Sequence, residues 1–492
     1  MTVDLDRVFA HIDGALEDHI AEVQAWVRQP SVSWDSLGVS ECAELVAQSY
    51  LDLGCSEVEV IEGRHHPGVW AYYDAGSPVT VHNYCMFDTR TVRPDDWSFD
   101  PWGGELMAQG PYPRVLTGRG ALSAKGPYVA FLNALRSIIA VEGDLPVNIM
   151  FLAEGEEIMG SPSYRDFVAR YQDRLATVAA SYCLTSSQSA AGVVSVGLGL
   201  KGMIVLELSA SGAAMERGPA ATIHSSAASL VDSPPFRLAQ ALATLTDEQG
   251  RGCRVRGLEG VMAYRKPLGQ QERRLLDDLA ERQAGRDWRD VLPVGGSGNV
   301  DRLVGGSEGI DPLLSLLYGP SFNLAGLRSG FLGPGSATIP FIVPQRATAT
   351  LDMRLVVESS PEEIIGLIRD HLDAHGFADI EIEVYAAFSH HQTPASHPYI
   401  QTVLGTLGDW GVEVELWPIQ AGGGPWTVVP NSFGVPCLRG GVVGGGSGGK
   451  GGADEYLIIE GDGKMAGLAE VEKLQVAQLS AFARAAAEAE AS

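Results

Sequence analysis

The sequence predicts an α/β domain that is interrupted by an inserted α+β domain. Before residue 202, apolar strands alternate with amphipathic helices, which is typical of a sheet covered by helices on both faces. Residues 203–388 instead contain strands in which apolar and polar residues alternate, joined by polar connections. Helical patterns resume after residue 389. We therefore expect one domain formed by residues 1–202 and 389–492, and a second formed by residues 203–388.

The first 160 residues contain the elements of the predicted main sheet. Helical spacing of apolar residues occurs in residues 5–28, 40–53 and 125–143. Strand patterns occur in residues 56–63, 68–76, 77–88 and 146–154. Ligands bind at the carboxyl ends of strands in such sheets, so we expect a site near Asp88 and the loop that follows residue 152.

The inserted domain and the C-terminal part show clear patterns of their own. Strands are predicted at residues 202–212, 347–357 and 379–388, and helices at residues 361–376, 397–411 and 469–491. The stretch 440–452, GGVVGGGSGGKGG, is glycine-rich. It is interpreted either as a flexible loop or as backbone that approaches a ligand closely.

Composition narrows the class of function. A chain of 492 residues is too long to form one ordinary hydrophobic core, so two or more domains are expected. Its 35 Lys+Arg against 61 Asp+Glu give a formal net charge of -26. Such a charge argues against nucleic acid or an anionic membrane as a partner. No apolar run approaches the ~20 residues of a membrane span, and the N-terminus lacks a signal pattern, so we expect a cytoplasmic protein. The six cysteines lack CxxC spacing and are expected to be reduced thiols.

The loop AEGEEIMGS, residues 153–161, concentrates negative charge at the end of an apolar strand. Glu154, Glu156 and Glu157 repel one another unless a cation or a shared proton offsets them. A loop of this kind presents carboxylates to a cation or to a water molecule. The plainer interpretation is a set of solvated loop carboxylates.

Seven short motifs follow one another in an order that resembles the M20 metallopeptidases. They are FDTRTVRPDDWSFDPW, TGRGALSAKG, FLAEGEEIMGS, IHSSAAS, TIPFIVPQRATATLDMRLVV, GGGP and GGADEY. The likeness spans nearly the whole chain and is greatest to the large-lid branch related to carnosine dipeptidases. It implies a catalytic α/β domain with an inserted lid, which also serves as a dimerisation domain, and hence a homodimer.

The resemblance also implies five positions that hold two zinc ions in the family. In this chain they fall on Met86, Ser123, Ile158, Thr185 (or the neighbouring Ser186) and Gly451. Zinc requires imidazole, thiolate or carboxylate ligands, which none of these side chains supplies. We therefore predict no zinc pair and no cofactor. A single ion held by Asp88 and Glu157 with His82 or Cys85 is a minor alternative.

Other positions keep the residue types that the family uses. By resemblance, Glu157 is the general base and His224 stabilises the oxyanion, reaching into the partner's site. Arg354 binds a substrate carboxylate, for which its planar fork is suited. The remaining orienting or substrate-binding positions are Asp88, Ser123, Lys125, Asn323 and Thr338.

Each of these residues also has an ordinary structural interpretation. His224 would be a hydrogen-bonded turn residue, Arg354 a member of an ion pair, and Lys125 a structural cation. Two nucleophiles are weaker alternatives, namely a Ser123–Lys125 pair and the Cys85 thiol. A further weaker alternative is that two acidic residues, Asp454 and Glu455, face the pocket.

The predicted function is that of a metal-independent enzyme on an M20 scaffold. Its substrate would be a small amide, peptide or N-acyl amino acid with a free carboxylate. The reaction would be acyl transfer, condensation, cyclisation or hydrolysis, with Glu157 as base. One alternative is a catalytically inactive homologue that binds a ligand or a partner. The other is a zinc-dependent dipeptidase or deacylase with non-standard ligands.

Overall fold

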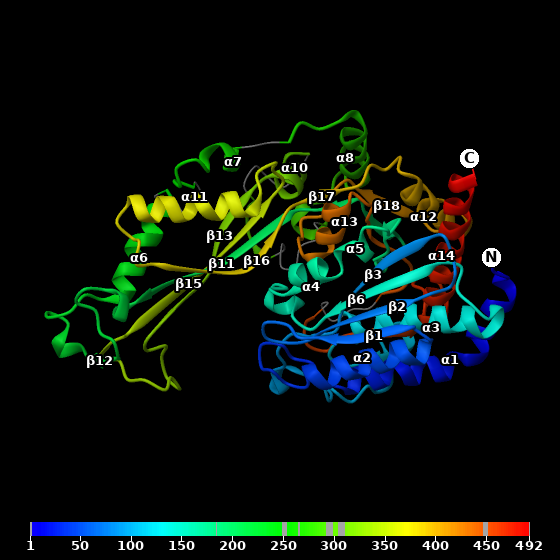
Figure 1. Ribbon diagram of the computed structural model, residues 1–492, viewed down its shortest axis with the longest axis horizontal. Helices are drawn as coiled ribbons and strands as arrows, with labels where there is room; N and C mark the ends of the chain where they lie inside the picture. Colours follow the sequence, from blue (N-terminus) through cyan, green and yellow to red (C-terminus); the bar gives the residue numbers. More distant parts are fainter. Residues whose placement is uncertain are drawn as a thin grey trace.

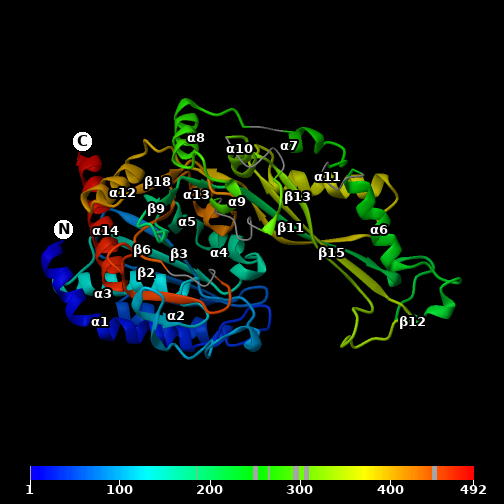
Figure 2. The same ribbon diagram turned by 180° about the vertical axis from the view of Figure 1, so that it is seen from behind.

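The chain folds into an α/β domain that holds both termini and an elongated lid that extends from it (Figure 1). The computed structural model describes residues 2–183, 185–247, 253–263, 266–291, 299–303, 310–445 and 451–491. The opposite face is seen in Figure 2. The predicted combination of a helix-covered sheet and an inserted α+β part is confirmed.

The main sheet has five strands in the order β1-β2-β6-β3-β7. Their bounds are β1 Glu57–Ile61, β2 Gly68–Tyr73, β3 Thr80–Met86, β6 Asn148–Glu154 and β7 Ala180–Ser181. β3 runs parallel to β6 and β7, whereas β1 and β2 form an antiparallel edge. The parallel pairing brings the carboxyl ends of β3 and β6 together, with Met86 opposite Glu154. This edge is where the sequence predicted a site.

Helices cover both faces of this sheet (Figure 1). One face carries α1 Leu5–Arg28, α2 Val39–Leu53, α3 Lys125–Glu142 and α14 Leu468–Ala491. The other carries α4 Tyr164–Arg170, α5 Gln172–Leu175 and α13 Val428–Phe433. The apolar stripes of α1, α3 and α14 pack together with the sheet in the largest buried cluster. α12 Pro398–Asp409 lies against α14 and completes this layer.

Two smaller sheets extend the domain beside the site. Their strands are β8 Thr185–Ser186, β9 Val194–Gly197, β18 Val414–Trp417 and β19 Arg439–Val442 in one, and β4 Leu106–Gln109, β5 Tyr112–Thr117 and β20 Tyr456–Glu460 in the other. β19 corrects one interpretation, because residues 440–442 of the glycine-rich stretch form a buried strand and not a flexible loop. At Gly440, with φ +79°, a Cβ would lie 2.2 Å from the Ser195 carbonyl oxygen. Residues 446–450 lie outside the described residues.

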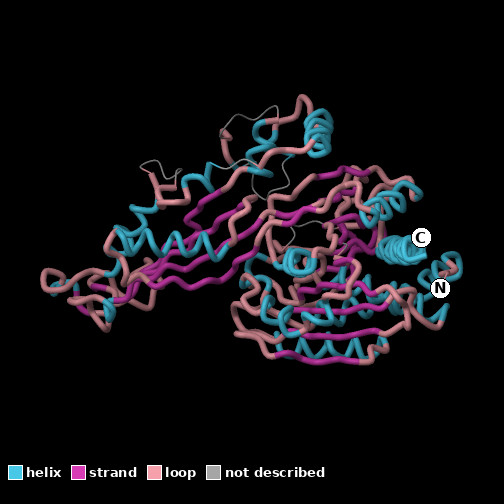
Figure 3. The backbone as a smooth tube through the Cα atoms, turned by 45° about the horizontal axis from the view of Figure 1, so that its top comes forward, coloured by secondary structure: helices cyan, strands magenta, loops and turns pink. Residues whose placement is uncertain are grey.

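The lid is built on a four-stranded antiparallel sheet (Figure 3). In sheet order its strands are β13 Ser321–Ser329, β15 Arg346–Leu355, β11 Gly202–Ser211 and β16 Glu381–Phe388. α6 Pro234–Leu245 and α11 Pro361–Ala374 pack on one face of it. β12 Ile223–His224 pairs with β14 Ile342–Val343 at the distal tip, and β10 Gly199–Leu200 pairs with β17 His391–Gln392 where the lid joins the α/β domain.

Part of the inserted segment packs on the α/β domain. Its helices are α7 Glu259–Ala263, α8 Gln270–Arg282, α9 Trp288–Val291 and α10 Asp311–Tyr318. Leu276 of α8 and Leu317 of α10 share a buried cluster with Trp417 and Ile419. Trp417 is the last residue of β18, and Ile419 follows that strand. Within the described part of the chain, no helix is both long and apolar enough to cross a membrane. All six cysteines are free thiols.

Candidate active site

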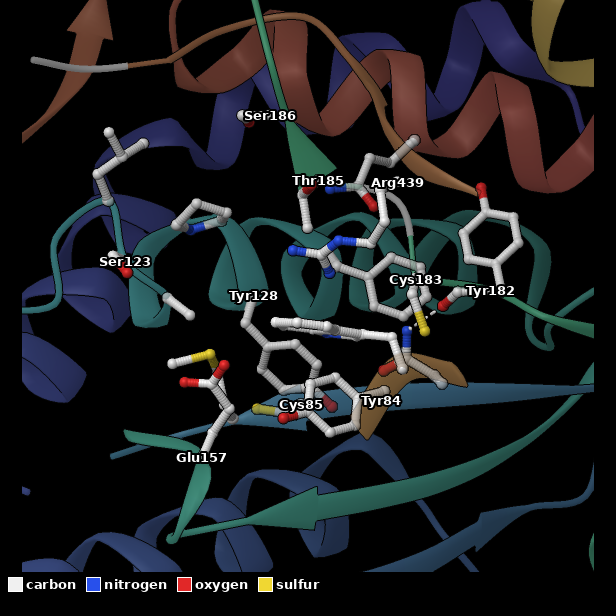
Figure 4. Close-up of a pocket in the computed structure, with 18 of the residues that line it drawn as sticks. Tyr84, Cys85, Ser123, Tyr128, Glu157, Tyr182, Cys183, Thr185, Ser186 and Arg439 are labelled. Atoms are coloured by element: carbon white, nitrogen blue, oxygen red, sulfur yellow. Dashed lines mark hydrogen bonds between the residues drawn. The ribbon is translucent and has the colours of Figure 1, made fainter. Parts of the chain in front are cut away.

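A pocket of about 260 Å³ opens at the carboxyl ends of β3 and β6. Its aromatic walls are formed by Tyr84, Tyr128, Phe131, Tyr182 and Trp426. Polar side chains reach it from several elements, and Figure 4 shows Glu157 and Ser123 on one side and Arg439 entering from the other. The pocket thus combines a carboxylate, hydroxyls and a guanidinium within mostly apolar walls.

The loop after β6 separates its three glutamates. Glu154 is fully buried and accepts hydrogen bonds from the hydroxyls of Tyr84 (2.8 Å) and Ser161 (2.9 Å). Glu156 is also buried and accepts the backbone N–H groups of His65 and His66 on one oxygen. Only Glu157 lines the pocket. The sequence suggested one crowded carboxylate cluster, but two members of it hold the loop in place.

Asp88 holds the backbone that presents Glu157. Its carboxylate accepts the N–H groups of Glu157 (3.1 Å) and Ile158 (2.9 Å) and the hydroxyl of Ser33 (2.7 Å). Burial, together with the negative charge of Glu157, raises the pKa of Asp88 to about 7 against those hydrogen bonds. Asp88 therefore lies beneath the pocket and binds the backbone that carries Glu157.

Glu154 adds a second buried acid under the same wall. Burial raises its pKa well above the usual range, and the charge of Asp88 acts in the same direction. Its Oε2 atom has no hydrogen-bond partner among the described residues. Burial in this environment favours the neutral form of the carboxyl group. The pocket wall thus rests on two buried acids, and the pKa of each is raised.

The positions that hold zinc in the family converge on this pocket. Met86, Ser123, Ile158 and Thr185 all line it, as does Ser186. Gly451 lies in an adjoining shallower pocket that shares Arg90 and Ile158. These positions thus lie together at one edge of the main sheet, and their former role in metal binding stays a prediction.

The donor set at these positions does not fit a zinc pair. A thioether, hydroxyls, an aliphatic side chain and a glycine do not supply the imidazole, thiolate or carboxylate groups that zinc requires. Within the described residues, no group of three or more His, Cys, Asp or Glu is arranged to hold a metal ion. The neighbouring segment 446–450, which is not described, contains only Gly, Ser and Lys. No step of the chemistry is therefore assigned to zinc.

Glu455 fixes the turn that carries Ser123. Its buried carboxylate accepts the backbone N–H groups of Gly120, Leu122 and Ser123 and pairs with Arg119 at 3.1 Å. It does not line the pocket, so the weaker alternative that it faces the pocket is not supported. Its neighbour Asp454 also points elsewhere, since it accepts hydrogen bonds from Ser98.

Lys125 is buried away from the pocket. Its ammonium group donates to the carbonyl oxygens of Trp26 (3.0 Å) and Gln29, and burial lowers its pKa. This geometry makes it a structural cation, so the predicted substrate contact is not formed. It also removes the Ser123–Lys125 nucleophile pair, because Ser123 faces the pocket.

The thiols at the pocket differ in character. Burial raises the pKa of Cys85 well above its usual value, which disfavours the nucleophile alternative. A hydrogen bond with Cys437 lowers the pKa of Cys183 to about 7, and the positive charge of Arg439 contributes in the same direction. The sequence analysis did not single out Cys183.

The candidate residues of the lid lie outside the pocket. His224 is exposed on β12, at the tip that Figure 1 shows farthest from the α/β domain. Asn323 on β13 and Thr338 in the following loop are exposed too. Arg354 donates to Asp352 at 2.9 Å, within β15. Within one chain, therefore, the structure does not bring these four side chains to Glu157.

Sequence reasoning missed two arginines at the pocket, Arg90 and Arg439. Arg439 lies just before the glycine-rich stretch, where a lone cation among apolar and glycine residues was a usable signal. Arg90 lies two residues after Asp88. The side chain of Arg90 occupies the space beside Gly451, since a Cβ at that position would lie 3.1 Å from Arg90 Cδ.

The chain thus combines an α/β domain, which has a pocket at its strand ends, with a lid built on an antiparallel sheet. Residues 217–379 match the peptidase dimerisation domain of the M20 family. The chain resembles the Cys-Gly metallodipeptidase dug1 of Schizosaccharomyces pombe, with 24% identity over 76% of each chain. It is similarly related to the Beta-Ala-His dipeptidase of Rattus norvegicus, with 24% identity over 75% of this chain and 74% of that one.

Solved structures agree on the fold. An M20 family metallo-carboxypeptidase from Sulfolobus solfataricus superposes with a TM-score of 0.76 and 24% identity, over 94% of this chain and 99% of the other. Human carnosine dipeptidase 1 gives a TM-score of 0.72 with 19% identity, over 98% of this chain and 100% of the other. The resemblance found in the sequence is confirmed: the chain has the M20 peptidase fold and carries the M20 dimerisation domain.

Proposed function

We propose that this protein is an enzyme that acts on the amide bond of a small peptide or N-acyl amino acid with a free carboxylate, without a zinc pair. One observation carries the proposal: Glu157 faces a small aromatic pocket whose former metal positions hold Met86, Ser123, Ile158 and Thr185. A retained base in a rebuilt pocket fits chemistry in which a carboxylate moves the proton.

Glu157 would act as general base. It takes a proton from the attacking nucleophile, which is water in hydrolysis or an amine in acyl transfer, and returns it to the leaving group. The apolar side chains of Met86 and Ile158 line the same pocket as Glu157. Asp88 contributes by fixing the backbone N–H groups of residues 157 and 158.

The zinc-dependent alternative keeps independent support. Curated relatives are described as metallodipeptidases, and this description favours a metal-dependent dipeptidase over a metal-free enzyme. The donor chemistry at the pocket favours the opposite conclusion. The third alternative, ligand binding without turnover, shares the pocket and differs only in the absence of reaction.

The deciding experiment measures metal content and turnover on the same preparation. Protein purified without chelator and dialysed against zinc is analysed for zinc per chain and then assayed with dipeptides and N-acyl amino acids. We expect near-zero zinc and turnover that chelator leaves unchanged. Glu157→Gln should lower kcat by about 10²- to 10⁴-fold, the usual contribution of a general base. Glu44→Gln, an exposed change on α2, is the matched control.

Two zinc ions per chain with chelator-sensitive turnover would instead establish the metallodipeptidase. Absence of turnover, together with ligand binding, would leave the binding-protein alternative. Unchanged turnover in Glu157→Gln would exclude this residue as the base.

We also propose that the protein is a cytoplasmic homodimer that pairs through its lid. The edge strand β13 exposes Leu324 and Leu327, and the loop after it exposes Phe331 and Leu332. An apolar edge of this kind is a surface suited to a second copy. His224, exposed on the same lid, would then reach the partner's pocket. Light scattering on size-exclusion eluate tests the assembly, and a fully active monomer would contradict the role of His224.

A further inference from the structure

We propose that Arg439, stacked on Trp426, forms the subsite that binds the carboxylate of the substrate. This inference rests on the proposed function and assigns its specificity. The guanidinium carbon of Arg439 lies 4.0 Å from the centre of the Trp426 ring, and both side chains line the pocket. In Figure 4 the guanidinium of Arg439 points into the space between Thr185 and Tyr128.

The charge of Arg439 lacks an internal carboxylate partner. Among the residues that the structure describes, no Asp or Glu forms an ion pair with it. Its guanidinium lies over the Trp426 ring, and its charge acts to lower the pKa of the Cys183 and Cys437 thiols. This is unusual in a chain with 61 acidic and 35 basic residues. A cation in an apolar pocket costs free energy unless an anion accompanies it, so the pocket is arranged for an anion that arrives with the ligand.

Other arginines of the structure show the contrast. Arg119 pairs with Glu455 at 3.1 Å, and Arg354 pairs with Asp352 at 2.9 Å. The residue expected from the resemblance to bind the substrate carboxylate, Arg354, is therefore already neutralised. Of the two arginines that line the pocket, Arg439 is the less exposed one, and it has taken over this task.

The stacking geometry leaves the edge of the guanidinium open. Trp426 covers one face of Arg439, so the in-plane N–H groups stay directed outward, where a carboxylate binds in a bidentate manner. Trp426 itself is held firmly. Its ring packs edge-on against Tyr84 at 5.6 Å, and a Cβ at Gly424 would lie 2.1 Å from that ring. The subsite is thus ordered before the ligand arrives, which lowers the entropic cost of binding.

Arg90 supplies a second positive charge at the mouth. It lines both the main pocket and the adjoining shallower pocket beside Gly451, and it is exposed. Positive charge at the mouth favours entry of an anion, but solvent screens it there. Arg439, deeper among aromatic side chains, is therefore the residue that determines affinity.

The size of the pocket limits the ligand. A volume of about 260 Å³ lies at or below the ~300 Å³ lower end of ordinary ligand sites, so a dipeptide or an N-acyl amino acid is the size that fits. The planar fork and the apolar walls favour a carboxylate over a phosphate, whose higher charge needs more donors. With the carboxylate on Arg439, the amide of such a ligand extends toward Glu157.

Binding measurements separate this inference from the proposed function, because they do not need turnover. The probes are N-acetyl derivatives of Ala, Leu, Phe and Glu, each with its C-terminal amide, and inorganic phosphate. Calorimetry with the full chain and with Glu157→Gln gives Kd for each. We expect at least one acid to bind, and its amide to bind about 10- to 100-fold more weakly, the range for a hydrogen bond to a charged group.

Arg439→Gln should weaken binding of the acid by the same factor and leave the affinity for its amide unchanged. Arg439→Lys should recover only part of the loss, because an ammonium group lacks the fork. Arg7→Gln, an exposed change on α1, is the matched control, and circular dichroism verifies that each variant folds.

Equal affinity for acids and amides, absence of binding by every acid, or unchanged acid binding in Arg439→Gln would overturn the inference. Tighter, Arg439-dependent binding of phosphate would overturn the choice of a carboxylate. Acid binding that depends on Arg439 without any turnover would support the subsite and reject the proposed enzyme. Turnover that depends on Glu157 but not on Arg439 would support the proposed enzyme and reject the subsite.

Discussion

The pocket lining and the buried layer beneath it have different compositions and different functions. The lining carries Met86, Ser123, Ile158 and Thr185, which present side chains to the ligand space. The layer beneath consists of fully buried acids and a lysine that bind backbone groups or, for Glu154, side-chain hydroxyls: Asp88, Glu154, Glu156, Glu455 and Lys125. The shape of the site is therefore held by groups that do not touch the ligand. A lining can change its chemistry while such a layer preserves the backbone.

The largest expected effect is the loss of Glu455, which belongs to the buried layer. Glu455→Ala leaves three backbone N–H groups and the Arg119 guanidinium without their partner. Removing one member of a buried ion pair costs about 3 to 5 kcal/mol of unfolding free energy. Urea unfolding followed by circular dichroism measures it.

Two variants sharpen this prediction. Glu455→Gln keeps an acceptor oxygen but removes the charge, so its loss should be intermediate. Asp454→Ala, at the neighbouring position, removes only hydrogen bonds to Ser98 near the surface and should cost much less. A loss below about 1 kcal/mol for Glu455→Ala would mean that the turn at residues 118–124 is held by packing alone.

The second prediction concerns the pH dependence of stability that Asp88 introduces. Its pKa is raised from 3.8 to about 7 by burial, so the folded protein resists its ionisation more than the unfolded chain does. For a raised pKa the contribution to stability is full below pH 3.8 and is lost as the pH rises to about 7. The slope is at most about 1.4 kcal/mol per pH unit for one group.

The Asp88→Asn variant isolates the contribution of Asp88 ionisation to the pH dependence of stability, because asparagine does not titrate. The difference in unfolding free energy, wild type minus variant, should shrink as the pH rises from 4 to 7, following the raised pKa of Asp88. Urea unfolding at several pH values gives both curves under matched conditions. A difference that stays constant or grows over this range would place the pKa of Asp88 at or below its ordinary value.

The sequence predicted the main fold because strands and helices of the α/β domain have strong apolar periodicity and a known motif order. It also located the pocket, since Met86, Ser123, Glu157 and Thr185 meet there. It did not place α8 and α10 against the α/β domain, because amphipathic helices in an insertion do not reveal which surface they cover.

The charged residues were harder to assign from sequence. Glu157, Glu455 and Lys125 lie in similar short motifs, yet one faces the pocket and two are buried in the support. Spacing along a loop gives no direction for a side chain, and the partners that decide it are distant in sequence, such as Trp26 for Lys125. Arg439 escaped notice for the same reason, since its partner Trp426 is found only in the fold.

The smallest expected effect on stability belongs to the lining, at Ser123. Its backbone N–H is bound by Glu455, whereas its side chain faces the pocket. Ser123→Ala should therefore change the unfolding free energy by no more than about 0.5 kcal/mol, in contrast to the loss at Glu455. Ser123→Ala keeps the backbone N–H that Glu455 binds and removes only the hydroxyl, so the two variants compare the lining with its support by the same urea unfolding measurement. If Ser123→Ala cost as much as Glu455→Ala, the hydroxyl would be part of the support, and the separation between lining and buried layer would not hold at this turn. A small effect together with altered affinity for N-acetyl amino acids would place Ser123 in the part of the pocket that contacts the ligand.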